Sequence, residues 1–220
     1  MKSVSAMAEK PQLRALPGGQ LGSAPPSDEA IVEGIVRGEE WAADALYDRV
    51  HTVVERTLRR LLREQSPDLE DLMQTSFERI ILTLSGRRFA GACSLPTWAS
   101  SIASHVAIDA LRARVRDRKL FRRESPSAPE LAEVAPSTPP ERRLEARSEV
   151  ERLHGILVRM KSDQARTLVL HDVLGHDLSE IAVLTGVTVA AAQSRLVRGR
   201  KELLRRAGVP GATNAGRRGS

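Results

Sequence analysis

Residues 178–200 read LSEIAVLTGVTVAAAQSRLVRGR and hold the most informative pattern in the chain. Asp177 and Glu180 stand three residues apart, as the two members of a capping box do at the start of a helix. Gly186 can adopt the positive φ angle that a sharp turn between two helices requires. A longer basic helix follows, and Thr188 is suited to cap it. A short helix, a glycine turn and a basic helix in this order predict a helix-turn-helix.

The second helix of this motif predicts contact with DNA. Residues 188–206 hold six basic residues and one acidic residue, and a recognition helix lies in the major groove with basic side chains on phosphates. An ordinary helical hairpin with a solvated basic face is the alternative, and charge alone favours it. The capping box, the turn glycine and the basic helix together favour DNA binding. The side chains expected to reach DNA are Gln193, Ser194, Arg195, Arg198 and Arg200.

The remainder of the chain also reads as helices. Apolar residues recur near helical spacing within residues 28–61, 69–84, 96–118 and 140–175, and Trp41 is among the apolar positions of the first stretch. No segment shows the alternation of period two that a half-buried strand requires. We therefore predict an all-α fold.

Prolines divide the chain into two small helical domains. Five prolines fall in residues 124–140, where a fixed φ and a missing amide donor oppose a helix or a strand. We expect this acidic stretch to be a flexible linker, and four prolines near the N-terminus indicate disorder there. The predicted units are a disordered tail at 1–27, a first domain at 28–118, a linker at 119–139, a second domain at 140–206 and a disordered tail at 207–220.

Charge is unevenly distributed along the chain. The 220 residues carry a net charge of +6, and the pI is about 10.2, which favours an anionic partner. Residues 28–78 hold 6 basic and 13 acidic residues, whereas residues 79–123 hold 10 basic and 2 acidic residues. This contrast indicates that different surfaces bind different partners.

Composition and motifs exclude several classes of protein. The single cysteine, Cys93, excludes a disulfide scaffold and a zinc or iron–sulfur site built from several cysteines. Neither the histidines nor the acidic residues have the spacing of metal ligands, so we expect no metal and no cofactor. No phosphate-binding loop or nucleophile elbow is present, and we expect no enzyme activity. Without a long apolar run or a signal sequence, we expect a cytoplasmic protein that does not insert into membranes.

Three stretches resemble the sigma-70 family of RNA polymerase sigma factors, especially its short extracytoplasmic-function (ECF) group. Within residues 156–204, the stretch RTLVLHDVLGHDLSEIAVLTGVTVAAAQSRLVRGRKELL resembles region 4. Two further stretches resemble region 2: DLEDLMQTSFERI at 68–80 and FAGACSLPTWASSIASHVAIDALR at 89–112. The matches to regions 2 and 4 occur in the family's order, on either side of the linker. This combination identifies the family more specifically than a helix-turn-helix alone.

The resemblance implies docking on core RNA polymerase. The family binds the β′ coiled coil of the polymerase with the polar side of the helix matched by 68–80, where Asp71, Gln74 and Glu78 share one face. Leu72, Phe77 and Ile80 are expected to lie toward the core. Region 4 of the family implies a contact with the β flap. An anti-sigma factor is a further partner implied by the family, because its members are commonly held inactive by one.

The resemblance also implies that residues 87–112 melt the promoter and hold unpaired bases of the minus-10 element. That task requires a basic approach path and a pocket for a flipped base. Trp98 can stack on a base, although its place on an apolar helix face favours the core. The implied minus-10 contacts are Arg87, Arg88, Ser94, Trp98, Ser101, His105 and Arg112.

Two departures from the family pattern bear on the promoter. The family often has arginines and an asparagine across residues 101–105, where this chain has Ser101, Ser104 and His105, and fewer positive charges weaken phosphate contact. Residues 190–193 read Ala-Ala-Ala-Gln where the family often has Gly-Thr-Val-Lys. Glutamine can pair with adenine, and alanine can contact a thymine methyl group. The expected minus-35 contacts therefore also include Thr188, Ala190 and Ala191.

The sequence predicts a transcription initiation factor that reads a minus-35 element with residues 188–200 and melts a minus-10 element with residues 87–112. Its expected partners are core RNA polymerase, promoter DNA and an anti-sigma factor. Two alternatives stay open: a conventional dimeric helix-turn-helix regulator, and a degenerate sigma-like module that binds polymerase or an inhibitor without initiating. The regulator predicts tight duplex binding at a palindrome without polymerase.

Overall fold

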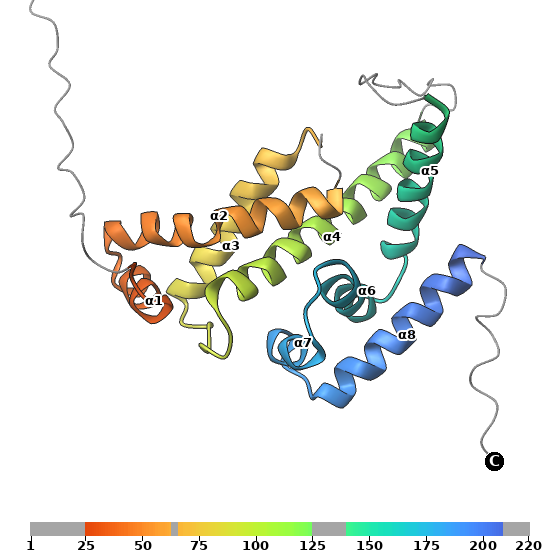
Figure 1. The fold of residues 1–220 in the computed structure, drawn as a ribbon. Coiled ribbons are helices and arrows are strands. Elements are labelled where there is room, and N and C mark those ends of the chain that lie inside the picture. The colour runs from red at the N-terminus through yellow and green to blue at the C-terminus, as the bar shows by residue number, and fades with distance from the viewer. Residues whose placement is uncertain (1–24, 63–65, 125–139, 209–220) are drawn as a thin grey trace, which may run out of the picture.

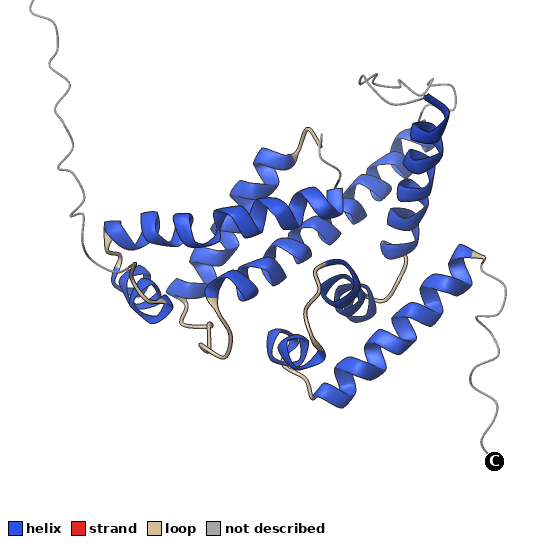
Figure 2. Cartoon of the chain, viewed as in Figure 1, coloured by secondary structure: helices blue, strands red, loops and turns tan. Residues whose placement is uncertain are grey.

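The computed structural model describes residues 25–62, 66–124 and 140–208, and every regular element among them is a helix (Figures 1 and 2). The prediction of an all-α fold is confirmed. The first lobe contains α1 (Asp28–Arg37), α2 (Glu40–Leu62), α3 (Leu69–Ser85) and α4 (Leu95–Glu124). The second lobe contains α5 (Pro140–Leu157), α6 (Ser162–Leu168), the π-helix η1 (Val169–Val173), α7 (Leu178–Thr185) and α8 (Val189–Ala207). Among the described residues, no single helix is long and apolar enough to cross a membrane.

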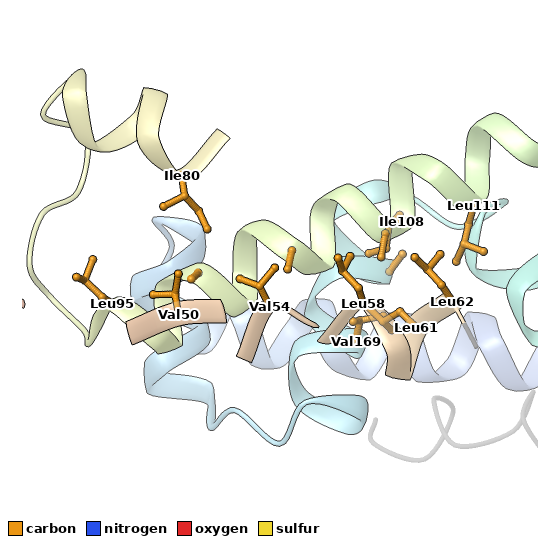
Figure 3. Close-up of a cluster of buried hydrophobic side chains, with 14 of the residues drawn as sticks. Val50, Val54, Leu58, Leu61, Leu62, Ile80, Leu95, Ile108, Leu111 and Val169 are labelled. Atoms are coloured by element: carbon orange, nitrogen blue, oxygen red, sulfur yellow. The ribbon is translucent and has the colours of Figure 1, made fainter. Parts of the chain in front are cut away.

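The core of the first lobe lies between α2 and α4, which run side by side (Figure 1). Small residues of α4, among them Ala103 and Ala107, are fully buried and let the two helices approach closely. Val50, Val54 and Leu58 of α2 point into this seam (Figure 3). A core of alanine and aliphatic side chains suits a chain with only 3% aromatic residues.

The first predicted stretch of helix is in fact two helices. Ser27 caps α1, with its Oγ accepting from the amide of Ala30, but the helix stops at Gly38, whose φ is +73°. Because α2 starts afresh, Trp41 does not enter the core. Its side chain is 45% exposed, and its indole donates to Glu39 Oε2 over 2.5 Å.

The approach of α1 to α2 is close at Gly34. A methyl group added there would lie 2.6 Å from the Cβ of Ala42, which is fully buried. We therefore expect Gly34→Ala to lower the free energy of unfolding by about 1–3 kcal/mol, because α1 must shift. Denaturant unfolding measures the loss. Gly155→Ala in α5 is the control, since an added methyl meets nothing within 4 Å, and it is expected to be neutral or stabilising. Equal stability of the two variants would contradict this close packing.

One boundary differs from the sequence prediction. Helix α4 continues to Glu124 instead of ending near Arg118, because no proline or glycine interrupts residues 119–124. Helix α5 begins at Pro140, where the second domain was predicted to start, since the first turn of a helix tolerates a residue without an amide donor. The predicted disorder at 1–24, 125–139 and 209–220 lies outside the described residues.

The two lobes are packed against each other in this structure. Helix α4 contacts α5, α6 and η1. Ile108 and Leu111 of α4 belong to the same buried cluster as Met160 and Val169 of the second lobe, and Val169 lies among first-lobe side chains in Figure 3. The lobes therefore share part of one hydrophobic core.

Candidate nucleic-acid and polymerase interfaces

The predicted helix-turn-helix is formed by α7 and α8. The carboxylate of Asp177 accepts from the amides of Ser179 and Glu180 at 2.7 and 2.8 Å, and Glu180 Oε2 accepts from the amide of Asp177 at 3.2 Å. Gly186 has a φ of +65° in the turn, and Thr188 Oγ1 accepts from an amide in the first turn of α8. The two helices are bent by 102°, within the range of helix-turn-helix motifs.

A small apolar core holds α8 in this orientation. Leu170, Ile181 and Ala192 are fully buried, and Leu196 is nearly so. Gly199 lies against the first turn of α6, where an added methyl would approach the backbone oxygen of Gln164 to 3.1 Å. The inner side of α8 is thus committed to packing, and its other side faces solvent.

The outward side of α8 presents most of the predicted minus-35 residues. Thr188, Ala190, Gln193, Ser194, Arg198 and Arg200 are exposed, and Ala191 and Arg195 are half-buried. A helix N-terminus with exposed polar and small apolar side chains is suited to contact base edges in a major groove.

The three predicted arginines of α8 differ in their partners. The Nη2 of Arg195 lies 3.3 Å from the Oδ2 of Asp163. Arg200 is paired with Asp172, and its hydrogen bond holds the pKa of the Asp172 carboxyl below its usual range. Arg198 donates to the backbone oxygen of Ser194 and has no acidic partner among the described residues. Arg198 is therefore the most available of the three for a phosphate.

The predicted docking residues lie together on the exposed side of α3. Asp71, Gln74 and Glu78 are exposed, and the Gln74 amide donates to Glu78 over 3.0 Å. Ile80 is fully buried, whereas Leu72 and Phe77 are half-buried. We call Asp71, Gln74 and Glu78 with their apolar extension the α3 face.

That extension was missed by the sequence analysis. Leu82 is 72% exposed and Ile81 is 39% exposed. Leu82 follows Asp71 by eleven residues, which is three helical turns, so helical spacing was the signal that places it on this face. Leu82 and Ile81 add exposed apolar surface beside the polar side chains of α3, and a protein-binding surface combines apolar and polar groups in this way.

The loop before α4 holds the exposed part of the predicted minus-10 site. Arg87, Arg88 and Ser94 are exposed. A pocket of about 400 Å³ opens beside Ser94. The Ser94 hydroxyl accepts a hydrogen bond from the backbone amide of Thr97 at the start of α4. The pocket is lined by Asp28, Glu29, Val32, Glu33, Phe89, Ala90, Gly91, Cys93 and Ser94. Asp28 is bound to Arg49 and to the amide of Leu95, and Glu33 is paired with Arg37. Glu29 is therefore the lining carboxylate best placed to accept from the amino group of a base, and all three carboxylates repel a phosphate.

Trp98 was predicted either to stack on a base or to pack in the core, and it lies between these two environments. Its side chain is half-buried and packs at the edge of the core. Its ring centroid lies 5.0 Å from that of Phe89, which is a normal distance for an aromatic pair. Because Phe89 lines the pocket, Trp98 supports the pocket wall from behind.

The remaining predicted minus-10 residues contact the second lobe. Ser101 is only 2% exposed and accepts a hydrogen bond from Arg166. His105 is half-buried, and Arg112 donates to the hydroxyl of Ser162 over 3.1 Å. The structure thus leaves Arg87, Arg88 and Ser94 open to solvent but covers this part of α4.

His105 predicts a pH dependence of stability. Burial, together with the charges of Arg166 and Arg79 and against that of Asp109, lowers the pKa of His105 to about 4. Its unfolded pKa is about 6.5, so the unfolded chain binds more protons between these values and stability falls as the pH decreases from 6.5 toward 4. Denaturant titrations at several pH values should show a loss of about 2–3 kcal/mol that His105→Asn lacks. Superimposable pH curves for the two proteins would contradict this assignment.

Comparison with known proteins gives the family. The family models for sigma-70 region 2 and for sigma-70, region 4 match residues 46–117 and 151–203. The RNA polymerase sigma factor CarQ of Myxococcus xanthus is 31% identical over 166 residues, which is 76% of this chain and 89% of that protein.

Two solved structures resemble the chain in shape. The structure of CnrH in complex with the cytosolic domain of CnrY has a TM-score of 0.48 and 20% identity, and the match covers 83% of this chain and 98% of that chain. The sigma factor RpoE in complex with the anti-sigma factor NepR from Bartonella quintana has a TM-score of 0.40 and 17% identity, over 71% and 91%. On the two family models and the identity to CarQ, the chain belongs to the sigma-70 family of RNA polymerase sigma factors, in its extracytoplasmic-function group.

Proposed function

We propose that this transcription initiation factor divides its work among three surfaces. The α3 face docks on the β′ coiled coil of core RNA polymerase, and the second lobe contacts the β flap. The outward side of α8 reads the minus-35 element. The loop at 86–94 and the adjoining part of α4 melt the minus-10 element and hold its unpaired bases.

The observation that carries this assignment is the separation of the two kinds of surface. The α3 face combines acidic and amide side chains with the exposed Leu82 beside Glu78. This mixture of polar and apolar groups suits a protein partner. The outward side of α8 exposes Gln193 and Arg198, which suits base and phosphate contacts. The two surfaces lie on different lobes, so one molecule can hold polymerase and DNA together.

The pocket beside the 86–94 loop supports the minus-10 role. Its volume of about 400 Å³ is large enough for one flipped base. Arg87 and Arg88 are exposed in the same loop, directly before the lining residues Phe89 and Ala90, and exposed arginines can contact the backbone of a single strand.

The proposal includes the chain's other attributes. The factor acts in the cytoplasm, where the polymerase is, and performs no catalysis itself because the polymerase carries out the chemistry. An anti-sigma factor is its proposed inhibitor. The structure of RpoE with the anti-sigma factor NepR concerns that protein and only motivates the search for such a partner.

Selection from a random DNA library tests the promoter assignment. The full chain and core polymerase together should enrich two elements at a fixed spacing, and Gln193→Ala should relax the sequence preference in the upstream element only. Arg206→Ala is the control, because Arg206 is paired with Glu202 at the far end of α8. Enrichment of one palindrome by the chain alone would favour the conventional regulator instead. Polymerase binding with no enriched element would favour a module that does not initiate.

A further inference from the structure

The second lobe inserts an arginine into the side of α4 that carries the predicted minus-10 residues. Arg166 of α6 donates from Nη2 to the Oγ of Ser101 over 3.0 Å and to the backbone oxygen of Leu184 over 3.2 Å. Ser101 and Ser104 are 2% and 0% exposed, and His105 lies close enough for the charge of Arg166 to act on it. We call Ser101, Ser104 and His105 the α4 socket.

Further polar contacts surround the α4 socket. The hydroxyl of Ser100 lies 2.9 Å from His176 Nε2, and the other ring nitrogen of His176 lies 3.1 Å from Glu180. Glu180 also closes the capping box of α7. The contact between the lobes therefore reaches the first helix of the helix-turn-helix.

The lobe contact has the character of an interface that can separate. The Nε of Arg166 is buried and has no hydrogen-bond partner among the described residues. Among these residues, no carboxylate accepts a hydrogen bond from the guanidinium of Arg166. Burial lowers the pKa of Arg166 to about 10. An incompletely satisfied buried cation opposes closure, whereas burial of Ile108 and Leu111 beside Met160 favours it. The two contributions oppose each other in the closed arrangement.

We propose that Arg166 in the α4 socket is a latch that holds the free factor closed and autoinhibited, so that the side of α4 needed for the minus-10 element is freed only when the lobes separate. The autoinhibitory part rests on the proposed minus-10 role of α4. The latch also gives a role to the small residues at 101 and 104. Ser101 accepts the hydrogen bond from Arg166, and basic side chains at these positions would repel its guanidinium.

Charge reversal across the latch is the test. Single-pair fluorescence energy transfer would report the distance between dyes on Asp48→Cys in α2 and Lys201→Cys in α8, both exposed positions, in a Cys93→Ser background. Ser101→Arg and Arg166→Glu are each expected to lengthen the mean distance, by like charge or by loss of the donor. The double variant restores an opposite pair and is expected to return most of the way to the closed distance.

The control for charge is Arg159→Glu, an equal reversal at an exposed position of the second lobe, which is expected to leave the distance unchanged. Ser101→Arg leaves the sequence of the second lobe intact, so it reports on the latch even if Arg166→Glu perturbs that lobe. Singles that keep the parent distance, or a double variant as open as either single, would overturn the latch and leave the proposed function standing.

Binding to a single-stranded minus-10 oligonucleotide then tests autoinhibition. Arg166→Glu is expected to bind about three- to tenfold tighter than Arg159→Glu, although both lose the same charge, because the competent open state is more populated. Opening without tighter binding would overturn autoinhibition and would count against the minus-10 role of α4.

Discussion

The double variant Asp71→Ala/Gln74→Ala is expected to bind core RNA polymerase about 100-fold more weakly than the parent protein. Both side chains are exposed on the α3 face. The side-chain amide of Gln74 donates a hydrogen bond to Glu78, which lies on the same face. Their removal should therefore leave the fold intact while deleting central contacts, each of which contributes about 1–2 kcal/mol at a protein interface. Fluorescence anisotropy with labelled protein measures the affinity.

Asp117→Ala is the matched control for the loss of one carboxylate, because Asp117 is exposed on α4 far along the chain from the α3 face. This variant should bind polymerase normally. Leu82→Ala should weaken binding without any change of charge, since the leucine is 72% exposed and has little to lose in the free protein. Full affinity in both α3 variants would move the docking surface elsewhere.

The double variant Gln193→Ala/Arg198→Ala is expected to lower transcription from the preferred promoter by about 30-fold while polymerase binding is unchanged. The glutamine contributes about 1–3 kcal/mol of base discrimination when it pairs with adenine. Arg198 contributes a phosphate contact, and its loss should reduce the slope of log affinity against log salt by about one. Run-off transcription and binding at several salt concentrations measure the two effects.

Arg198 is a better choice for this variant than its neighbours. Arg195 and Arg200 are paired with Asp163 and Asp172, so removing either one also leaves a carboxylate without its partner. A loss of polymerase binding in the Gln193→Ala/Arg198→Ala variant would show that α8 was assigned the wrong partner.

Local patterns in the sequence were enough to predict the helix-turn-helix. The capping box at Asp177, the left-handed Gly186 and the Thr188 cap are all formed by residues within a few positions of one another. Such contacts depend on local backbone geometry, which short sequence patterns report directly. The same holds for the exposure of Gln193 and Arg198.

Contacts between distant residues were not predictable in this way. Ser101 and Arg166 are 65 positions apart, and nothing in either segment alone shows that they meet. Ser101 and His105 were therefore predicted as minus-10 contacts with reduced positive charge, and not as residues that meet the second lobe. Periodicity also gave no warning that Gly38 divides the first helical stretch, in which Trp41 was counted among the recurring apolar positions although its side chain is 45% exposed.

Mixing the purified full chain with core RNA polymerase and mapping transcription starts on genomic DNA tests the central claim most directly. The account predicts that the chain co-elutes with the polymerase and that specific starts appear which core polymerase alone does not give. The Asp71→Ala/Gln74→Ala variant should lose both results together. No co-elution, with tight and specific duplex binding by the chain alone, would contradict the account.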